Sequence, residues 1–189
     1  EIPKVLLAAV PDHSEWEGQS LEDLALEWDI PIDQAVDRIL NQAGDGVFAV
    51  RFAINEEDVR TVLKHPSTMI GSDGLGYGSK PHPRHFGTFP RVLGHYARNE
   101  EVLSMKDAIH KMTGMPAAKF NLIDRGIIRE NAFADLVIFD PLTIIDRATY
   151  ENPRQNPTGI PWVIVNGSIT VRDSVHTGAL AGHGIRRGR

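Results

Sequence analysis

The sequence predicts an α/β fold, because short apolar stretches that suit buried strands alternate with amphipathic stretches that suit helices over residues 1–70. Composition supports a folded protein: hydrophobic residues make up 41% and charged residues 24% of the 189 residues, as in ordinary globular chains. At about 150 residues per domain, this length allows one or two domains with a substantial core. The first strand is predicted at residues 4–10, an apolar run that ends before Pro11.

Two helices are predicted after this strand. Ser20 followed by Asp23 is a helix-start signal, and it places a helix at residues 21–28. Pro31 opens a second amphipathic helix, because proline favours the first helical turn, and Gly44 ends it.

A strand, a helix and another strand are predicted next. Residues 47–54 alternate well enough between apolar and polar side chains to indicate a half-buried strand. Asn55 is placed to cap the helix that follows. The four-residue apolar run at residues 68–71 predicts a further buried strand.

The second half of the sequence changes from helices to strands. Helices are predicted at residues 90–98, 104–112 and 117–121, and strands at residues 134–139, 161–165 and 168–172. Asn166-Gly167 is a strong two-residue hairpin signal between the last two strands. The shift in composition near residue 124 predicts a domain boundary, with domains at residues 1–123 and 124–189.

Composition and charge exclude several classes of protein. The net charge is −5 and no basic block is present, which argues against a nucleic-acid-binding surface. No apolar run approaches the roughly 18 residues of a membrane-spanning helix. The absence of cysteine excludes disulfide scaffolds and thiolate zinc sites within this chain, and it suits a reducing compartment, so a cytoplasmic location is predicted.

The segment most informative about chemistry is residues 68–84, in which Asp73 follows the predicted buried strand. In barrels of parallel strands, residues at the carboxyl ends of the strands carry the chemistry. A carboxylate there is able to ligate a metal or to take a proton from water. Asp before Gly is also common in turns, so a purely structural role is equally supported by the spacing.

Gly74, Gly76 and Gly78 follow Asp73 in a spacing that matches neither the dinucleotide-binding fingerprint nor the phosphate-binding P-loop. We interpret this stretch as a flexible loop over a site. Arg84 comes after the loop. It could clamp a substrate carboxylate through two parallel hydrogen bonds, or it could pair with a local acid.

Five stretches of the sequence, in this order, resemble the N-acyl-D-amino-acid deacylases, or D-aminoacylases, of the amidohydrolase superfamily. They are TMIGSDG (68–74), HPRHFGTFPRVLGHYAR (82–98), HKMTGMPAAKF (110–120), ADLVIFDP (134–141) and VIVNG (163–167).

This resemblance implies a metal-dependent (β/α)8 barrel joined to a small β-sandwich, and the hydrolysis of N-acyl-D-amino acids to a carboxylic acid and a D-amino acid. Asp73 matches the family aspartate at the end of the last barrel strand. That residue would ligate zinc, accept a proton from the attacking water and pass it to the leaving amine. Arg84 matches the arginine that binds the substrate α-carboxylate. Ile54 is similar in position to a residue that lines the side-chain pocket.

The resemblance covers the carboxyl-terminal part of the family. Residues 1–123 correspond to the last portion of the barrel, and residues 124–189 to a segment of the sandwich. The family's upstream histidine blocks are not in this sequence, so most zinc ligands are expected upstream of Glu1, which is not a Met. We expect the chain to be inactive alone, because a single carboxylate does not hold zinc tightly. Because a partial barrel exposes strand edges and apolar faces, we also expect the chain to associate with copies of itself or with an upstream fragment, or else to be poorly stable alone.

Two alternatives stay open at this stage. A cyclic-amide hydrolase, such as a dihydroorotase or hydantoinase, is the nearest enzyme in the superfamily, although the PHPR stretch (81–84) favours a deacylase. A non-catalytic module kept for assembly or structure is the alternative from another class.

Overall fold

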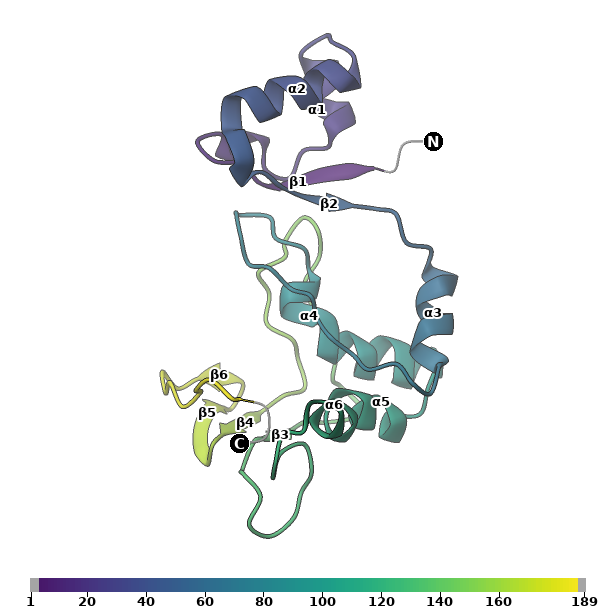
Figure 1. Cartoon of the computed structure of the whole chain (residues 1–189), viewed down its shortest axis with the longest axis vertical. Helices are drawn as coiled ribbons and strands as arrows, with labels where there is room; N and C mark the ends of the chain where they lie inside the picture. Colours follow the sequence, from purple (N-terminus) through teal and green to yellow (C-terminus); the bar gives the residue numbers. More distant parts are fainter. Residues whose placement is uncertain (1–3, 187–189) are drawn as a thin grey trace. The chain divides into compact units, whose positions relative to one another are not determined.

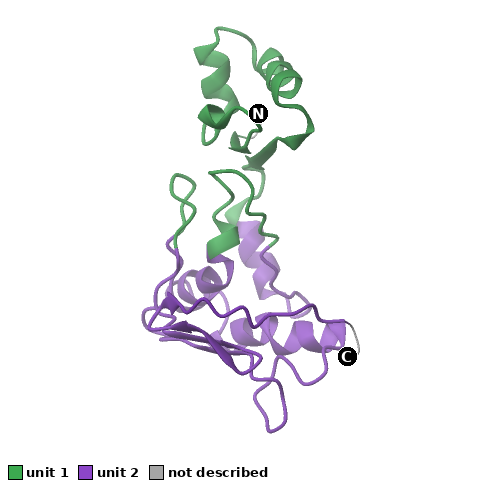
Figure 2. Cartoon of the chain, turned by 90° about the vertical axis from the view of Figure 1, so that its left-hand side faces the viewer, with its two compact units in different colours: residues 1–56, 73–86, 148–155 green, residues 57–72, 87–147, 156–189 purple. Residues whose placement is uncertain are grey.

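The computed structural model describes residues 4–186 and shows a mixed α/β chain that divides into two compact units (Figure 2). Unit 1 comprises Glu1–Glu56, Asp73–Phe86 and Ala148–Gln155. Unit 2 comprises Glu57–Ser72, Gly87–Arg147 and Asn156–Arg189. All three predicted site residues belong to unit 1.

Unit 1 contains a two-stranded antiparallel sheet and two helices (Figure 1). In β1 and β2, Leu6 lies opposite Val50. The elements of this unit, in chain order, are β1 (Val5–Ala9), a 3-10 turn (Ser14–Trp16), α1 (Leu21–Glu27), α2 (Ile32–Ala43), a second 3-10 turn (Gly44–Gly46) and β2 (Phe48–Arg51). The two strands and two helices predicted for this part of the chain are confirmed.

The core of unit 1 lies between β1 and the two helices. Leu24 of α1 and Ile39 of α2 are 0% and 2% exposed, and they pack with Leu7, Val10 and Trp16 in one cluster. These positions are the apolar faces of the predicted helices and of the first strand, which explains why the pattern of the sequence locates them correctly.

A reciprocal cap fixes the start of α1. The hydroxyl of Ser20 accepts a hydrogen bond from the backbone N–H of Asp23 at 3.1 Å, and the Asp23 carboxylate accepts one from the Ser20 N–H at 3.3 Å. Both bonds satisfy backbone donors that a helix start otherwise leaves without partners.

Unit 2 contains the remaining helices and a four-stranded antiparallel sheet (Figure 1). Its helical elements are α3 (Glu56–Lys64), α4 (Arg84–Arg91), the π-helical η3 (Val92–Asn99), α5 (Met105–Met112) and α6 (Gly114–Phe120); α3 and α4 begin in unit 1. The strands pair in the order β3 (Leu136–Ile138), β4 (Trp162–Val165), β5 (Ser168–Arg172) and β6 (Val175–His176). Its core cluster consists of Leu63, Val92, Leu93, Tyr96, Ala97, Val102, Ala108 and Ile144.

The predicted hairpin between β4 and β5 is confirmed. Asn166 and Gly167 have φ values of 48° and 81°, the left-handed conformations that a type I′ turn requires at both positions. The three strands predicted for this half are present as β3, β4 and β5, and β6 is an additional short strand.

The strand predicted at residues 68–71 is wrong, because these residues form no strand. Their backbone groups bond to α5 instead of to a neighbouring strand. The Ile70 N–H donates to the Lys111 carbonyl at 3.1 Å, and the Thr68 carbonyl accepts from Lys111 Nζ at 3.1 Å. Asp73 therefore follows an irregular segment and not a paired strand.

The helix predicted at residues 90–98 begins earlier, at Arg84, and its second part is the π-helix η3. Pro90 lies inside α4, where it supplies no N–H for the helical ladder. Gly94 of η3 lies against the chain at Ile144, since a Cβ at Gly94 would come 2.2 Å from the Ile144 carbonyl oxygen. This close approach lets η3 pack on the backbone of the core residue Ile144.

Every strand pair in the described residues is antiparallel. The barrel and sandwich implied by the resemblance and the domain boundary near residue 124 stay predictions. Among residues 4–186, no helix combines the length and the apolar character that crossing a bilayer requires.

We expect Ser20→Ala to lower the opening free energy of unit 1 by about 1 kcal/mol, because it removes the hydroxyl that caps α1. Hydrogen–deuterium exchange followed by mass spectrometry should then be faster in peptides from α1. Ser104→Ala is the matched control, because the Ser104 hydroxyl caps α5 of unit 2 by accepting from the Asp107 N–H at 3.0 Å. Equal effects of both variants on the α1 peptides would contradict this role of Ser20.

Candidate active site

Asp73 and Arg84 form an ion pair in unit 1. Arg84 Nη2 lies 2.7 Å from Asp73 Oδ2, although ten residues of loop separate the two positions. The side chains are 83% exposed for Asp73 and 40% for Arg84, so the pair lies at the surface of the described chain. Of the two roles considered for Arg84, pairing with a local acid is therefore observed, and the acid is the other predicted site residue.

The backbone around Asp73 explains why a glycine follows it. Asp73 has a φ of 46°, a left-handed conformation that Asp tolerates better than most residues. A Cβ at the next position, Gly74, would come 2.7 Å from the Cα of His85. The loop thus passes directly against the first turn of α4, which keeps Asp73 near Arg84.

The glycine spacing serves packing against β1 as well. Gly78 has a φ of 71°, and a Cβ there would come 2.1 Å from the carbonyl oxygen of Ala8. The Lys80 N–H then donates to the same oxygen at 3.2 Å. The loop lies on the backbone of β1, which accounts for the glycines without a bound phosphate.

Glu17 joins this loop to the end of β1. Its two carboxylate oxygens accept hydrogen bonds from the Ser79 N–H at 2.6 Å and from the Val10 N–H at 2.9 Å. Burial raises the pKa of Glu17, but these hydrogen bonds lower it more, so its pKa lies below the ordinary value.

The segment 148–155 also contacts this loop. Arg154 Nη2 donates to the Gly76 and Gly78 carbonyls at 3.2 and 2.7 Å, and Lys80 Nζ donates to the Glu151 carbonyl at 2.7 Å. Our interpretation of a flexible loop did not anticipate these anchors. Glu17 and Arg154 were missed because their partners are backbone atoms distant in the sequence, which leave no pattern in it.

Ile54 lies between β2 and α3, with 80% of its surface exposed. None of the contacts described within residues 4–186 joins it to Asp73 or Arg84. Its assignment to a substrate pocket stays a prediction.

His82 contacts the backbone of Arg84. Its Nδ1 accepts a hydrogen bond from the Arg84 N–H at 3.0 Å. Burial lowers the pKa of His82, the positive charge of Arg84 lowers it further, and the negative charge of Asp73 opposes both. Within residues 4–186, no group of three or more His, Asp or Glu side chains is arranged to hold a metal ion.

A buried lysine holds residues 65–68 of unit 2, which follow α3. Lys111 is 6% exposed, and its Nζ donates to the carbonyls of His65 and Thr68 and to the Thr68 hydroxyl. A buried charged group needs hydrogen-bond partners, and these three oxygen atoms supply them for the Lys111 ammonium in place of an acidic side chain. The sequence contains no signal for this role, because the partners are again mainly backbone oxygens.

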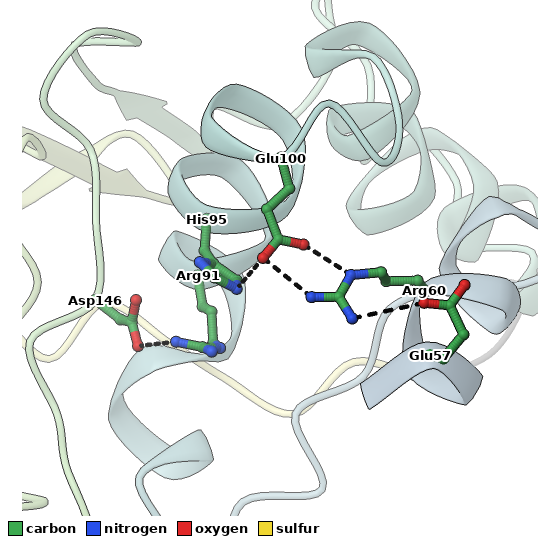
Figure 3. Close-up of polar contacts among 6 residues, drawn as sticks. All are labelled: Glu57, Arg60, Arg91, His95, Glu100 and Asp146. Carbon is green, nitrogen blue, oxygen red and sulfur yellow. Dashed lines mark hydrogen bonds and ion pairs between the residues drawn. The ribbon is translucent and has the colours of Figure 1, made fainter. Parts of the chain in front are cut away.

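A second charged cluster lies in unit 2 and is distinct from the ion pair of Asp73 (Figure 3). Glu100 accepts from Arg60 Nε and Nη2 at 2.9 and 3.1 Å, and it lies 3.0 Å from His95 Nε2. Arg91 pairs with Asp146 at 3.4 Å. The hydrogen bonds from Arg60 lower the pKa of Glu100, although burial opposes them. We interpret the contact of Arg60 with Glu100 as structural, because it joins α3 to the residue that follows η3.

Unit 2 also carries an apolar groove with a volume of about 620 Å³. Sixteen residues from α4, η3, α5 and the strand region line it, including Phe89, Leu93, Met112, Ile127 and Val137. Ile127, Ile128 and Val137, which line this groove, expose 52%, 91% and 55% of their surfaces.

The sequence matches the amidohydrolase family over residues 10–171. It is 48% identical to a D-aminoacylase of Alcaligenes xylosoxydans xylosoxydans over 139 aligned residues. The aligned region covers 74% of this chain and 29% of that protein. An N-acyl-D-glutamate deacylase of the same organism is 44% identical over 82% of this chain and 31% of its own length.

Solved structures give the same result. A D-aminoacylase whose binuclear metal centre has been studied superposes with a TM-score of 0.90 at 40% identity, covering 97% of this chain and 38% of that one. The N-acyl-D-glutamate deacylase of Bordetella bronchiseptica, complexed with zinc and a phosphonate inhibitor, superposes with a TM-score of 0.84 at 37% identity. This superposition covers 89% of this chain and 35% of that one. The resemblance seen in the sequence is confirmed, and the chain spans about a third of the length of these proteins.

We expect Glu17→Gln to flatten the acid dependence of stability. Because the folded pKa of Glu17 is lowered, its carboxylate stabilises the fold fully above the ordinary value of 4.5, and this contribution is lost as the pH falls through the lowered pKa. Urea unfolding should therefore show a higher free energy of unfolding for the parent than for the variant at about pH 7, and this difference should shrink as the pH is lowered to about 3. Glu27→Gln, on α1 of the same unit, is the control. Parallel profiles for parent and Glu17→Gln would refute the role of this carboxylate.

Proposed function

This chain belongs to the amidohydrolase family, and we propose that it forms part of a zinc-dependent hydrolase that cleaves the amide of N-acyl-D-amino acids to a carboxylic acid and a D-amino acid. The deacylase relatives, at 48% and 44% identity, support this activity. The observation that carries the proposal is the ion pair of Asp73 and Arg84. It joins a carboxylate able to move a proton to a guanidinium able to bind a carboxylate.

Asp73 is the catalytic acid and base of this proposal. Its carboxylate takes a proton from the water that attacks the amide carbonyl, and it returns this proton to the departing nitrogen. Protonation is needed because an amide nitrogen leaves poorly as an anion. The 83% exposure of Asp73 supports the role, since water and substrate have access to the side chain.

Arg84 binds the substrate α-carboxylate in this proposal. A guanidinium presents its five N–H donors in a planar fork that matches a carboxylate. The substrate carboxylate competes with Asp73 for this fork, so substrate binding exchanges one ion pair for another. The exchange brings the scissile amide next to the Asp73 carboxylate.

The chain supplies part of the proposed zinc site. Zinc in proteins takes three or four side-chain ligands, and residues 4–186 contain no group of three suitable side chains. Asp73 would be one ligand, and the others would have to come from outside this chain. The Bordetella bronchiseptica structure with zinc supports the choice of metal.

Ile54 lines the pocket for the substrate side chain in this proposal. Its apolar side chain is 80% exposed and so is available for contact with a ligand. The proposal also includes a small N-acyl-D-amino acid as the substrate, no nucleic-acid partner, and a cytoplasmic location. The net charge of −5 and the absence of cysteine support the last two points.

The proposed architecture is the last portion of a (β/α)8 barrel with part of a β-sandwich, paired with the rest of a longer protein or with another copy. The apolar groove of unit 2 supports this pairing, because its exposed side chains, such as Ile127, Ile128 and Val137, would be removed from water if a partner covered them. The 38% coverage of the D-aminoacylase structure supports a partner that is the remainder of such a protein.

We expect the 189-residue chain, supplied with zinc, to hydrolyse neither N-acetyl-D- nor N-acetyl-L-amino acids. A single carboxylate does not hold zinc in a catalytic geometry. Product release is measured with intact mass recorded on the same sample, and cyclic amides are included to test the related hydrolases. Turnover by a species of 20.9 kDa alone would contradict the proposed ligand set.

In a complete protein of the relatives' length that contains this chain, we expect Asp73→Asn to lower kcat by about 10²- to 10⁴-fold, because the general acid and base is lost. Arg84→Lys should chiefly raise KM, since lysine does not form the bidentate contact. Asp12→Asn is the matched control, because Asp12 is another exposed aspartate of unit 1 with a positive φ, 60°. Full activity of Asp73→Asn on N-acyl-D-amino acids would refute the proposed mechanism.

A further inference from the structure

His82 accepts the first backbone donor of α4. Its Nδ1 lies 3.0 Å from the Arg84 nitrogen, and its own carbonyl accepts the next donor, the His85 N–H, at 3.0 Å. The Phe86 N–H bonds to the Pro83 carbonyl at 3.0 Å. Three consecutive donors at the start of α4 are thus satisfied within a few residues, two of them by His82.

The His82 ring is oriented by a second residue. Tyr150 Oη lies 3.4 Å from His82 Nε2, and the two rings meet edge to face with centroids 5.3 Å apart. Tyr150 in turn packs on Phe52 at 4.7 Å. Because Nδ1 accepts from Arg84, a neutral imidazole carries its proton on Nε2, and this nitrogen then donates to Tyr150.

Two further properties keep His82 in this role. Pro83, between His82 and Arg84, has a ring-restricted φ, so the turn has little freedom to move. Burial lowers the pKa of His82, which favours the neutral ring whose Nδ1 keeps the lone pair that accepts from Arg84.

We propose that His82 is a positioning residue for substrate binding: its Nδ1 fixes the backbone of Arg84, and so aims the Arg84 guanidinium at the substrate α-carboxylate. This inference rests on the proposed function of Arg84. A long arginine side chain loses considerable rotamer freedom when it binds, and a fixed backbone limits where the guanidinium can go. The consequence is expected in substrate affinity and not in the proton transfers at Asp73.

The test compares three variants of a complete protein of the relatives' length that contains this chain. His82→Ala removes the acceptor, and we expect KM for N-acyl-D-amino acids to rise about three- to tenfold, with a much smaller change in kcat. His82→Asn should restore KM, because the Asn side-chain oxygen takes the place of Nδ1 and accepts from the N–H two residues on. His82→Gln, whose longer amide replaces Nε2, should behave like His82→Ala.

A spectroscopic measurement tests the same contact without catalysis. In the parent protein labelled with ¹⁵N-histidine, His82 should give the Nε2–H tautomer, and the Arg84 amide should exchange slowly with solvent. In His82→Ala that amide should exchange faster, and in His82→Asn it should again be protected. An Nδ1–H tautomer in the parent would overturn the inference.

Arg84→Lys separates failure of the inference from failure of the proposed function. If Arg84→Lys raises KM while His82→Ala does not, or while His82→Asn fails to restore it, the positioning role of His82 is overturned and the role of Arg84 stands. If Arg84→Lys leaves KM unchanged, the proposed function of Arg84 is refuted, and the inference falls with it.

Discussion

The loop of the candidate site runs directly over the backbone of β1, and the close approach at Gly78 makes this possible. A side chain there would meet the Ala8 carbonyl, and the loop would have to move away from the strand. The same carbonyl then accepts from the Lys80 N–H, after which the chain turns into α4. The positions of Asp73 and Arg84 at the two ends of this loop, and hence their ion pair, depend on this contact.

Charged side chains hold the site mostly through backbone atoms. Glu17 binds the N–H groups of Val10 and Ser79, and Arg154 binds the carbonyls of Gly76 and Gly78. Such contacts fix the course of the chain between Asp73 and Arg84. Asp73 and Arg84, at the two ends of this stretch, pair with each other at 2.7 Å.

Local patterns predicted most elements of the fold, whereas contacts between distant residues were beyond them. The Ser20 cap and the Asn166-Gly167 turn depend on neighbours in the sequence, so both were found. The strand predicted at residues 68–71 is wrong because an apolar run becomes a strand only when another strand pairs with it. Here the backbone groups of Thr68 and Ile70 bond to Lys111 instead. Asp73 and Arg84 were candidates from their positions before and after the Gly-rich loop, and the family resemblance implied their roles. Their contact became known with the structure, whereas the anchors Glu17 and Arg154 left no trace in the sequence.

Unit 1 is assembled from three separated stretches of chain, the last of which is 148–155. The contacts that join these stretches, such as Tyr150 with His82 and Arg154 with Gly78, link residues far apart in the sequence, and such contacts form slowly because long loops must close first. During synthesis, a chain released from the ribosome as far as residue 147 lacks the side chains of Tyr150 and Arg154 that hold the loop and the His82 ring. The helices and the strand pair of unit 1 are able to form before residue 148 has been made, whereas the arrangement around Arg84 is completed after residues 148–155 have been added.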